Sequence, residues 1–169
     1  DGLYASPLAD VLEAVPTGFL TETPYRPQVT KDGKKHPVTA KLPGSEGATP
    51  TWGHWFRLVD ASVNDDTKPL LAGPDEKPLL VLKRVGEGRV AQLLSDHGWL
   101  WARGYDGGGP QLELLRRMAH WLMKEPDLEE EALNAKQVGD QLRIERRTMA
   151  DTAPPVKMTA PSGKESQIS

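Results

Sequence analysis

The chain has 169 residues, of which 37% are hydrophobic, and carries a formal net charge of −3. This balance excludes the strongly basic character with which proteins hold phosphate backbones, so we expect no nucleic-acid partner. The absence of cysteine excludes disulfides, thiolate metal ligands and a thiol nucleophile within the chain, and no stretch approaches the roughly 18 apolar residues of a membrane helix.

A helix is predicted near the start of the chain. Ser6 is a favourable N-cap, and proline, here Pro7, is common at the first helical position. Four apolar residues follow at the spacing of one helical face: Leu8, Val11, Leu12 and Val15. Pro16 is expected to end this helix. Residues 17–75 are rich in proline and predicted to be mostly irregular, with short extended pieces around Thr21–Tyr25 and Phe56–Val59. An irregular segment of this length is typically functional or disordered.

Two apolar segments predict the centre of a sheet. Leu79–Val85 and Arg89–Ser95 are separated by Gly86-Glu87-Gly88, which favours a tight reversal. Their nearly continuous apolar character indicates strands that are buried on both faces. An amphipathic helix is predicted from Pro110 to about Lys124. Its expected inner stripe consists of Leu112, Leu115, Ala119 and Leu122, widened by Leu114, Met118 and Trp121.

The C-terminal part begins with the acidic connector Glu125–Glu131. Alternating apolar and polar residues in Leu133–Val138 and Gln141–Arg146, on either side of Gly139-Asp140, predict a hairpin with one solvent-exposed face. Val156–Thr159 is predicted to be a further strand. This part therefore has the pattern of the start of a small β-sandwich-like module.

Asp96 and His97 directly follow the second apolar strand, where α/β folds often place their chemistry. They are the candidates for a catalytic acid–base pair. The alternative is a loop histidine without a catalytic task, because no nucleophile accompanies it. The other histidines are His36, His54 and His120, and no pair has the i, i+4 spacing of a helical metal site. We expect no metal and no cofactor.

Two further groups are candidates for ligand binding. The aromatic candidates for a carbohydrate or partner platform are Trp52, Trp55 and Trp99, which can instead cover a core that is short of aliphatic residues. The backbone candidates for holding an anion at a helix start are Gly107, Gly108 and Gly109, which can instead form a flexible turn. Trp99 and Trp101 alternate, so one is expected to face inward and the other outward.

Several motifs resemble one known group of proteins. They are G-x-G-R-V within Val85–Val90, Ser95-Asp96-His97, the helix Leu112–Met123 and the upstream stretch His36-Pro37-Val38-Thr39. From Gly2 to Pro126 the sequence resembles the class I glutamine amidotransferase-like superfamily, above all the amidotransferase-like domains of large bacterial membrane proteins and more distantly ThuA-like proteins.

This resemblance implies an α/β fold, a flavodoxin-like three-layer sandwich that is incomplete at its N-terminus. Residues 1–126 would be the C-terminal part of that domain, and residues 127–169 a connector and the start of the β module. The family's cysteine elbow would lie N-terminal to this sequence, which begins at Asp1 without methionine and is expected to be a piece of a longer protein. His97 falls near the family's histidine, but Trp99 stands where the acid of working enzymes would be.

The sequence thus favours a non-catalytic interaction or scaffolding domain, in the soluble portion of a membrane-anchored bacterial protein. The alternatives are an amidotransferase or hydrolase whose nucleophile lies upstream, for which a G-x-C-x-G elbow in the parent would argue, and a carbohydrate-binding module. Expected partners are proteins of the cell envelope or other domains of the same chain. A homo-oligomer is also expected, because Leu79–Leu82 would form an apolar edge strand.

Overall fold

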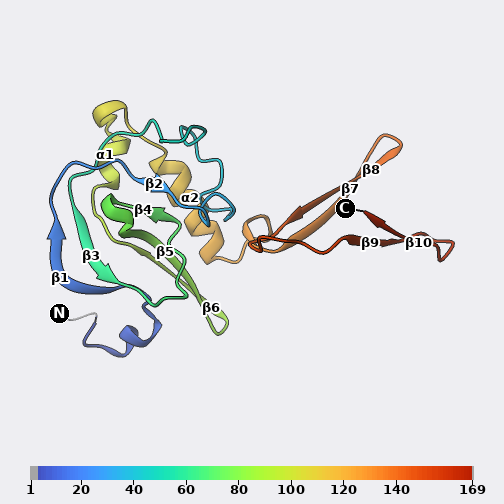
Figure 1. Cartoon of the computed structure of the whole chain (residues 1–169), viewed down its shortest axis with the longest axis horizontal. Coiled ribbons are helices and arrows are strands. Elements are labelled where there is room, and N and C mark those ends of the chain that lie inside the picture. The colour runs from blue at the N-terminus through green and yellow to red at the C-terminus, as the bar shows by residue number, and fades with distance from the viewer. Residues whose placement is uncertain (1–3, 169) are drawn as a thin grey trace. The chain divides into compact units, whose positions relative to one another are not determined.

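The computed structural model describes residues 4–168, and the chain divides into two compact units. The first unit extends to Glu130, and the second begins at Glu131. Antiparallel strands build both units, and the two α-helices of the described residues belong to the first (Figure 1). None of the helices formed by residues 4–168 has both the length and the apolar composition needed to cross a membrane.

Short strands and short helices make up the first unit. Its strands within the described residues are β1 (Val15–Thr21), β2 (Gln28–Val29), β3 (Leu58–Ser62), β4 (Leu71–Ala72), β5 (Pro78–Val85) and β6 (Gly88–Leu93). Its helices are α1 (Gly98–Ala102), α2 (Gln111–Leu122) and the 3₁₀ helices Pro7–Val11, Pro74–Glu76, Tyr105–Gly107 and Pro126–Leu128.

All strand pairs in the first unit are antiparallel, so the predicted flavodoxin-like, three-layer α/β sandwich is wrong. One sheet has the order β2-β4-β5-β6, and a second consists of β1 and β3. The tight reversal predicted at Gly86-Glu87-Gly88 is present, since Val85 pairs with Gly88. A turn this short joins only antiparallel strands, because a parallel pair needs a crossover of a dozen or more residues.

The apolar segment at residues 79–82 lies inside this sheet rather than at its edge, because β5 pairs with β4 on one side and β6 on the other. Burial on both faces holds for the start of β5, where Leu79, Leu80 and Val81 are buried in succession. The strand β6 is only partly buried. The edge argument for a homo-oligomer therefore fails, and the oligomeric state stays a prediction.

The predicted N-terminal helix is also wrong in its second half. Ser6 does cap a 3₁₀ helix at Pro7–Val11, with its Oγ accepting from Leu8 N–H at 3.3 Å. After it, the side chain of Gln92 accepts from Ala14 N–H and donates to Ala14 O, both at 2.9 Å. These bonds replace helical ones and hold the chain extended, so Val15 starts β1 in a segment that its apolar spacing assigned to a helix. The segment predicted to be mostly irregular contains the short strands β2, β3 and β4 and most of β1, and β3 overlaps the extended piece expected around Phe56–Val59.

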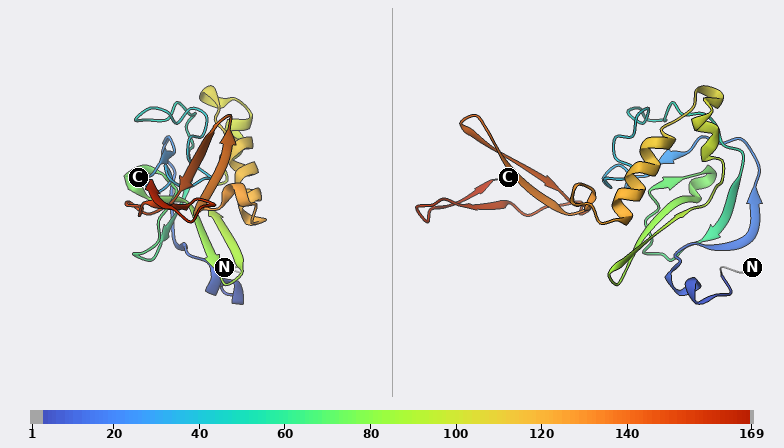
Figure 2. Two further views of the ribbon diagram at one scale, coloured as in Figure 1. Left: turned by 90° about the vertical axis from the view of Figure 1, so that its right-hand side faces the viewer. Right: turned by 180° about the vertical axis from the view of Figure 1, so that it is seen from behind.

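Helix α2 forms where predicted, but its inner face is centred on Leu114, Met118 and Trp121, which were expected only to widen the inner stripe. Leu114 and Trp121 are buried, at 2% and 1% exposure, whereas Leu112 is 81% exposed. The views in Figure 2 show α2 on the side of β6, which it contacts. There the Arg89 guanidinium lies 4.9 Å from the centre of the Trp121 ring. A large aromatic ring that also holds a cation gains more from the inner position than a leucine does.

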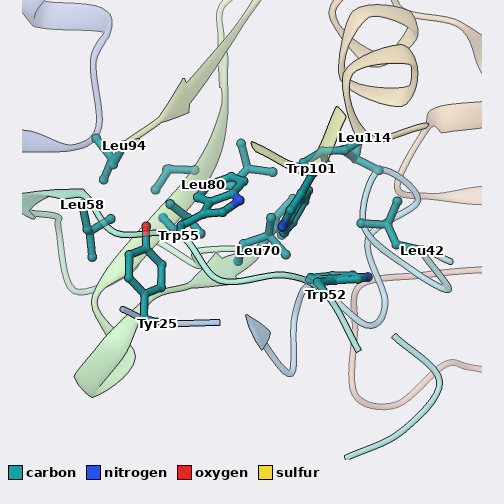
Figure 3. Close-up of a cluster of buried hydrophobic side chains, with 14 of the residues drawn as sticks. Tyr25, Leu42, Trp52, Trp55, Leu58, Leu70, Leu80, Leu94, Trp101 and Leu114 are labelled. Atoms are coloured by element: carbon teal, nitrogen blue, oxygen red, sulfur yellow. The ribbon is translucent and has the colours of Figure 1, made fainter. Parts of the chain in front are cut away.

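The core of the first unit is centred on Trp52, Trp55 and Trp101, which we call the tryptophan cluster (Figure 3). The ring centre of Trp101 lies 4.6 Å from that of Trp55 and 5.0 Å from that of Trp52. Two of the indole N–H groups are satisfied by backbone carbonyls: Trp101 donates to Gly53 O at 2.9 Å, and Trp52 donates to Pro43 O at 2.7 Å. The cluster therefore joins α1 to a distant loop by both packing and hydrogen bonds.

The second unit consists of two hairpins within the described residues. They are β7 (Ala132–Val138) with β8 (Gln141–Arg147), and β9 (Val156–Thr159) with β10 (Glu165–Ile168). The predicted turn at Gly139-Asp140 and the strand at Val156–Thr159 are confirmed. The expectation of a single exposed face on the first hairpin is wrong, because nearly all of its side chains are exposed, including Leu133 and Leu142 at 58% and 53%.

Substituting Trp55→Ala should lower the free energy of unfolding by about 3–5 kcal/mol, because it removes a fully buried ring that packs against Trp101. The matched control is Trp99→Ala, since Trp99 is 54% exposed and its truncation should change stability by no more than about 0.5 kcal/mol. Denaturant unfolding followed by circular dichroism measures both. Equal effects of the two substitutions would contradict the proposed core.

Candidate functional site

His97 serves as a hydrogen-bond acceptor for the backbone. Its Nδ1 accepts from Phe56 N–H at 3.0 Å, so the neutral ring carries its proton on Nε2. Nε2 lies 3.9 Å from Asp96 Oδ1, which is beyond hydrogen-bond distance. Asp96 is exposed and instead lies 3.7 Å from the Arg57 guanidinium. Neither ring nitrogen is thus free to accept a proton. The ring instead connects the loop after β6 to the segment before β3 by a hydrogen bond. The acid–base role of Asp96 and His97 stays a prediction that this geometry does not favour.

A different histidine has the orientation that acid–base chemistry requires. His54 Nδ1–H donates to Asp106 Oδ2, which leaves Nε2 as the unprotonated nitrogen. The two side chains are 38% and 43% exposed. The hydrogen bond from the His54 side chain lowers the pKa of Asp106, and the Arg26 guanidinium, 4.0 Å away, acts in the same direction. The sequence analysis missed this pair because the two residues are 52 positions apart.

The glycine-rich loop has a packing role. A Cβ at Gly109 would lie 2.4 Å from the Trp101 ring, and one at Gly53 would lie 2.3 Å from Tyr105 O. Gly53 N–H donates to Gly108 O at 2.7 Å, and Gly107 has a φ of +90°. These positions therefore require glycine so that the loop can close over the tryptophan cluster. Anion binding by Gly107, Gly108 and Gly109 stays a prediction.

Only one of the three tryptophans predicted to bind ligands is accessible. Trp52 and Trp55 are 2% and 0% exposed and pack within the core, whereas Trp99 is 54% exposed. Trp99 and Trp101 do face opposite ways, as expected, although they lie on α1 rather than on a strand. A stacking platform made of all three rings does not exist in this fold, since stacking on a sugar needs an open ring face.

Glu130 is the last residue of the first unit, and its side chain lies in a network of hydrogen bonds. It accepts from Trp121 Nε1–H at 3.0 Å, pairs with the Arg84 guanidinium and lies 3.3 Å from His36 Nε2. His36 is 4% exposed, and its Nδ1 accepts from Val38 N–H at 3.2 Å. Burial raises the pKa of the Glu130 carboxyl, but the hydrogen bonds from His36 and Arg84 outweigh it and bring the pKa well below 4.5. The network attaches the acidic connector to the sheet.

An apolar stripe remains on the outer face of α2, and we call it the α2 stripe. It consists of Leu112, Leu115, Ala119 and Leu122, and Met123 extends it at the end of the helix. Leu112, Leu115, Leu122 and Met123 are 81%, 43%, 39% and 62% exposed. The residues predicted to form the inner stripe are thus gathered on the surface.

No protein family, curated protein or solved structure matches the chain. The resemblance to amidotransferase-like domains therefore stays a prediction. Residues 4–168 contain no group of three or more histidines and carboxylates placed to hold a metal ion.

Substituting His97→Ala should lower the free energy of unfolding by about 1–3 kcal/mol, because it leaves the partly buried Phe56 N–H without its acceptor. His97→Asn should retain part of the stability, since its amide oxygen can take the place of Nδ1. Denaturant unfolding at neutral pH measures both. Equal stability of the two variants would contradict this structural role of the His97 ring.

The Glu130 network should make stability depend on pH. The folded-state pKa of Glu130 lies below the 4.5 of an unperturbed carboxyl, so its ion pairs stabilise the fold above pH 4.5, and this stabilisation is lost as the pH falls toward the folded-state pKa. Glu130→Gln should therefore be less stable than the wild type at neutral pH, and the difference should shrink below pH 4.5. Urea unfolding as a function of pH measures it. The exposed Glu125→Gln is the control, and a pH profile that Glu130→Gln leaves unchanged would contradict the network.

Proposed function

We propose that this chain is a non-catalytic interaction domain of a bacterial membrane-associated protein, and that the α2 stripe makes the contact. The observation that carries the proposal is the exposure of large apolar side chains along one face of a regular helix. Single exposed leucines are common on protein surfaces, whereas a contiguous apolar patch marks an interaction site. The membrane association rests on the resemblance alone.

The orientation of α2 supports a surface role for this stripe. Arg117 donates to Ala40 O at 2.7 Å, and Arg89 donates to Trp121 O at 2.5 Å. Rotating α2 to bury the stripe would break both bonds and would expose the Trp121 ring. The side chains of the stripe can therefore be buried only by a surface that is not part of the core of the first unit.

The second candidate function is an amidotransferase or hydrolase role, with a nucleophile from another part of the longer protein. The favourable observation is the free Nε2 of His54, whose ring is held by Asp106. A histidine oriented by a carboxylate in this way can accept a proton from a nucleophile. This candidate assigns the base to His54 rather than to His97.

Site-specific photo-cross-linking in cells that naturally produce this chain tests the interaction function. A photoreactive phenylalanine derivative at Leu112, Leu115 or Leu122 should give covalent adducts, because these positions lie in the contact. The same group at His120, off the stripe, or at Glu87, at the exposed β5–β6 turn, should give few. Equal yields at all five positions would contradict the proposal.

Two substitutions separate the two candidate functions. Under the enzymatic alternative, His54→Gln would abolish the amidotransferase or hydrolase activity. Leu115→Ser would leave that activity intact.

A further inference from the structure

We propose that the α2 stripe binds one amphipathic α-helix that carries acidic residues beside its apolar face. This inference rests on the proposed interaction function and specifies the partner.

The spacing of the stripe indicates a helical partner. Its residues follow one another at intervals of three, four and three positions, from Leu112 through Leu115 and Ala119 to Leu122. This is the a/d spacing with which two α-helices pack side chains as knobs into holes. A β-strand repeats every two residues and cannot follow such a seam along its length. The small Ala119 in the middle provides the space into which a large side chain of the partner helix fits.

The charge beside the stripe indicates an acidic partner. Arg116 lies directly next to the stripe, and its side chain is 50% exposed. Glu113 is its partner at 2.9 Å, but the same carboxylate also binds Arg117 at 2.6 Å, so one negative charge serves two guanidinium groups. With Leu112 and Ala119 at a positions and Leu115 and Leu122 at d positions, Arg116 occupies the e position that flanks the seam. A partner helix with a glutamate facing Arg116 gains attraction there.

A second copy of this chain fits the stripe less well. Antiparallel pairing of two stripes about their midpoint would bring the two copies of Arg116 close together. Like charges placed side by side at an interface cost free energy and select against that partner. The same charges favour an acidic helix, so we assign the stripe to a heterologous partner.

Two designed helical peptides test this inference. Both carry leucine at the a and d positions; the acidic probe has glutamate at the flanking e and g positions, and the basic probe has lysine there. Titration of the full chain by fluorescence anisotropy should give binding of the acidic probe that is at least about tenfold tighter than that of the basic probe. Arg116→Gln should reduce this preference while binding is retained.

Matched variants locate the binding. Leu112→Ser and Leu115→Ser should each weaken binding of the acidic probe about tenfold. Leu133→Ser, which changes a leucine of similar exposure in the second unit, should leave binding unchanged. Thermal unfolding of the same variants checks that they fold, as the exposure of these leucines leads us to expect.

Each alternative outcome overturns a different statement. Equal affinity for both probes would refute the acidic partner. No binding of either probe, with stripe-specific cross-links still formed in cells, would refute the helical partner and leave the interaction function standing. Dimerisation of the chain that Leu115→Ser abolishes would assign the stripe to a second copy. Binding to anionic phospholipid vesicles that requires Leu112 and Leu115 would assign it to a membrane surface. Loss of the stripe-specific cross-links as well would refute both proposals.

Discussion

Packing around the Trp101 ring is the constraint on which the first unit depends. The ring contacts Trp52 and Trp55, and its N–H donates to Gly53 O. Gly109 lies so close to the ring that no other residue fits without a shift. Helix α1, the glycine-rich loop and the segment before β3 are thereby fixed relative to one another, because each contributes one side of the same buried contact.

His54 and His97 take their different hydrogen-bonding roles from this arrangement. The segment that carries Trp52 and Trp55 also carries His54 and Phe56. His54 lies beside Asp106, and the backbone N–H of Phe56 donates to His97. His54 donates through Nδ1 and leaves Nε2 free, whereas His97 accepts through Nδ1. The two rings therefore differ in tautomer, and His97 serves as a structural acceptor for Phe56 N–H. The surroundings of each ring, rather than the type of residue, decide which nitrogen carries the proton.

Helix α2 has apolar residues on two faces, and the fold uses only one. Trp121 turns inward because its ring packs beneath Arg89 and its N–H reaches Glu130. The leucines at 112 and 115 have no polar atom with which to join that network. They are left on the surface at a spacing that suits another helix. The proposed interaction function and the proposed helical partner both rest on this choice of face.

The sequence by itself determined the elements whose cause is local. Glycines specified the reversals at residues 86–88 and 139–140, Ser6 specified a helix cap, and the position of α2 followed from its own periodicity. Tertiary structure decided the rest: the antiparallel order of the sheet, the inner face of α2 and the approach of His54 to Asp106. These features depend on pairs of residues that are distant in the chain, and such pairs form only when the whole unit packs its apolar side chains and pairs its buried polar groups.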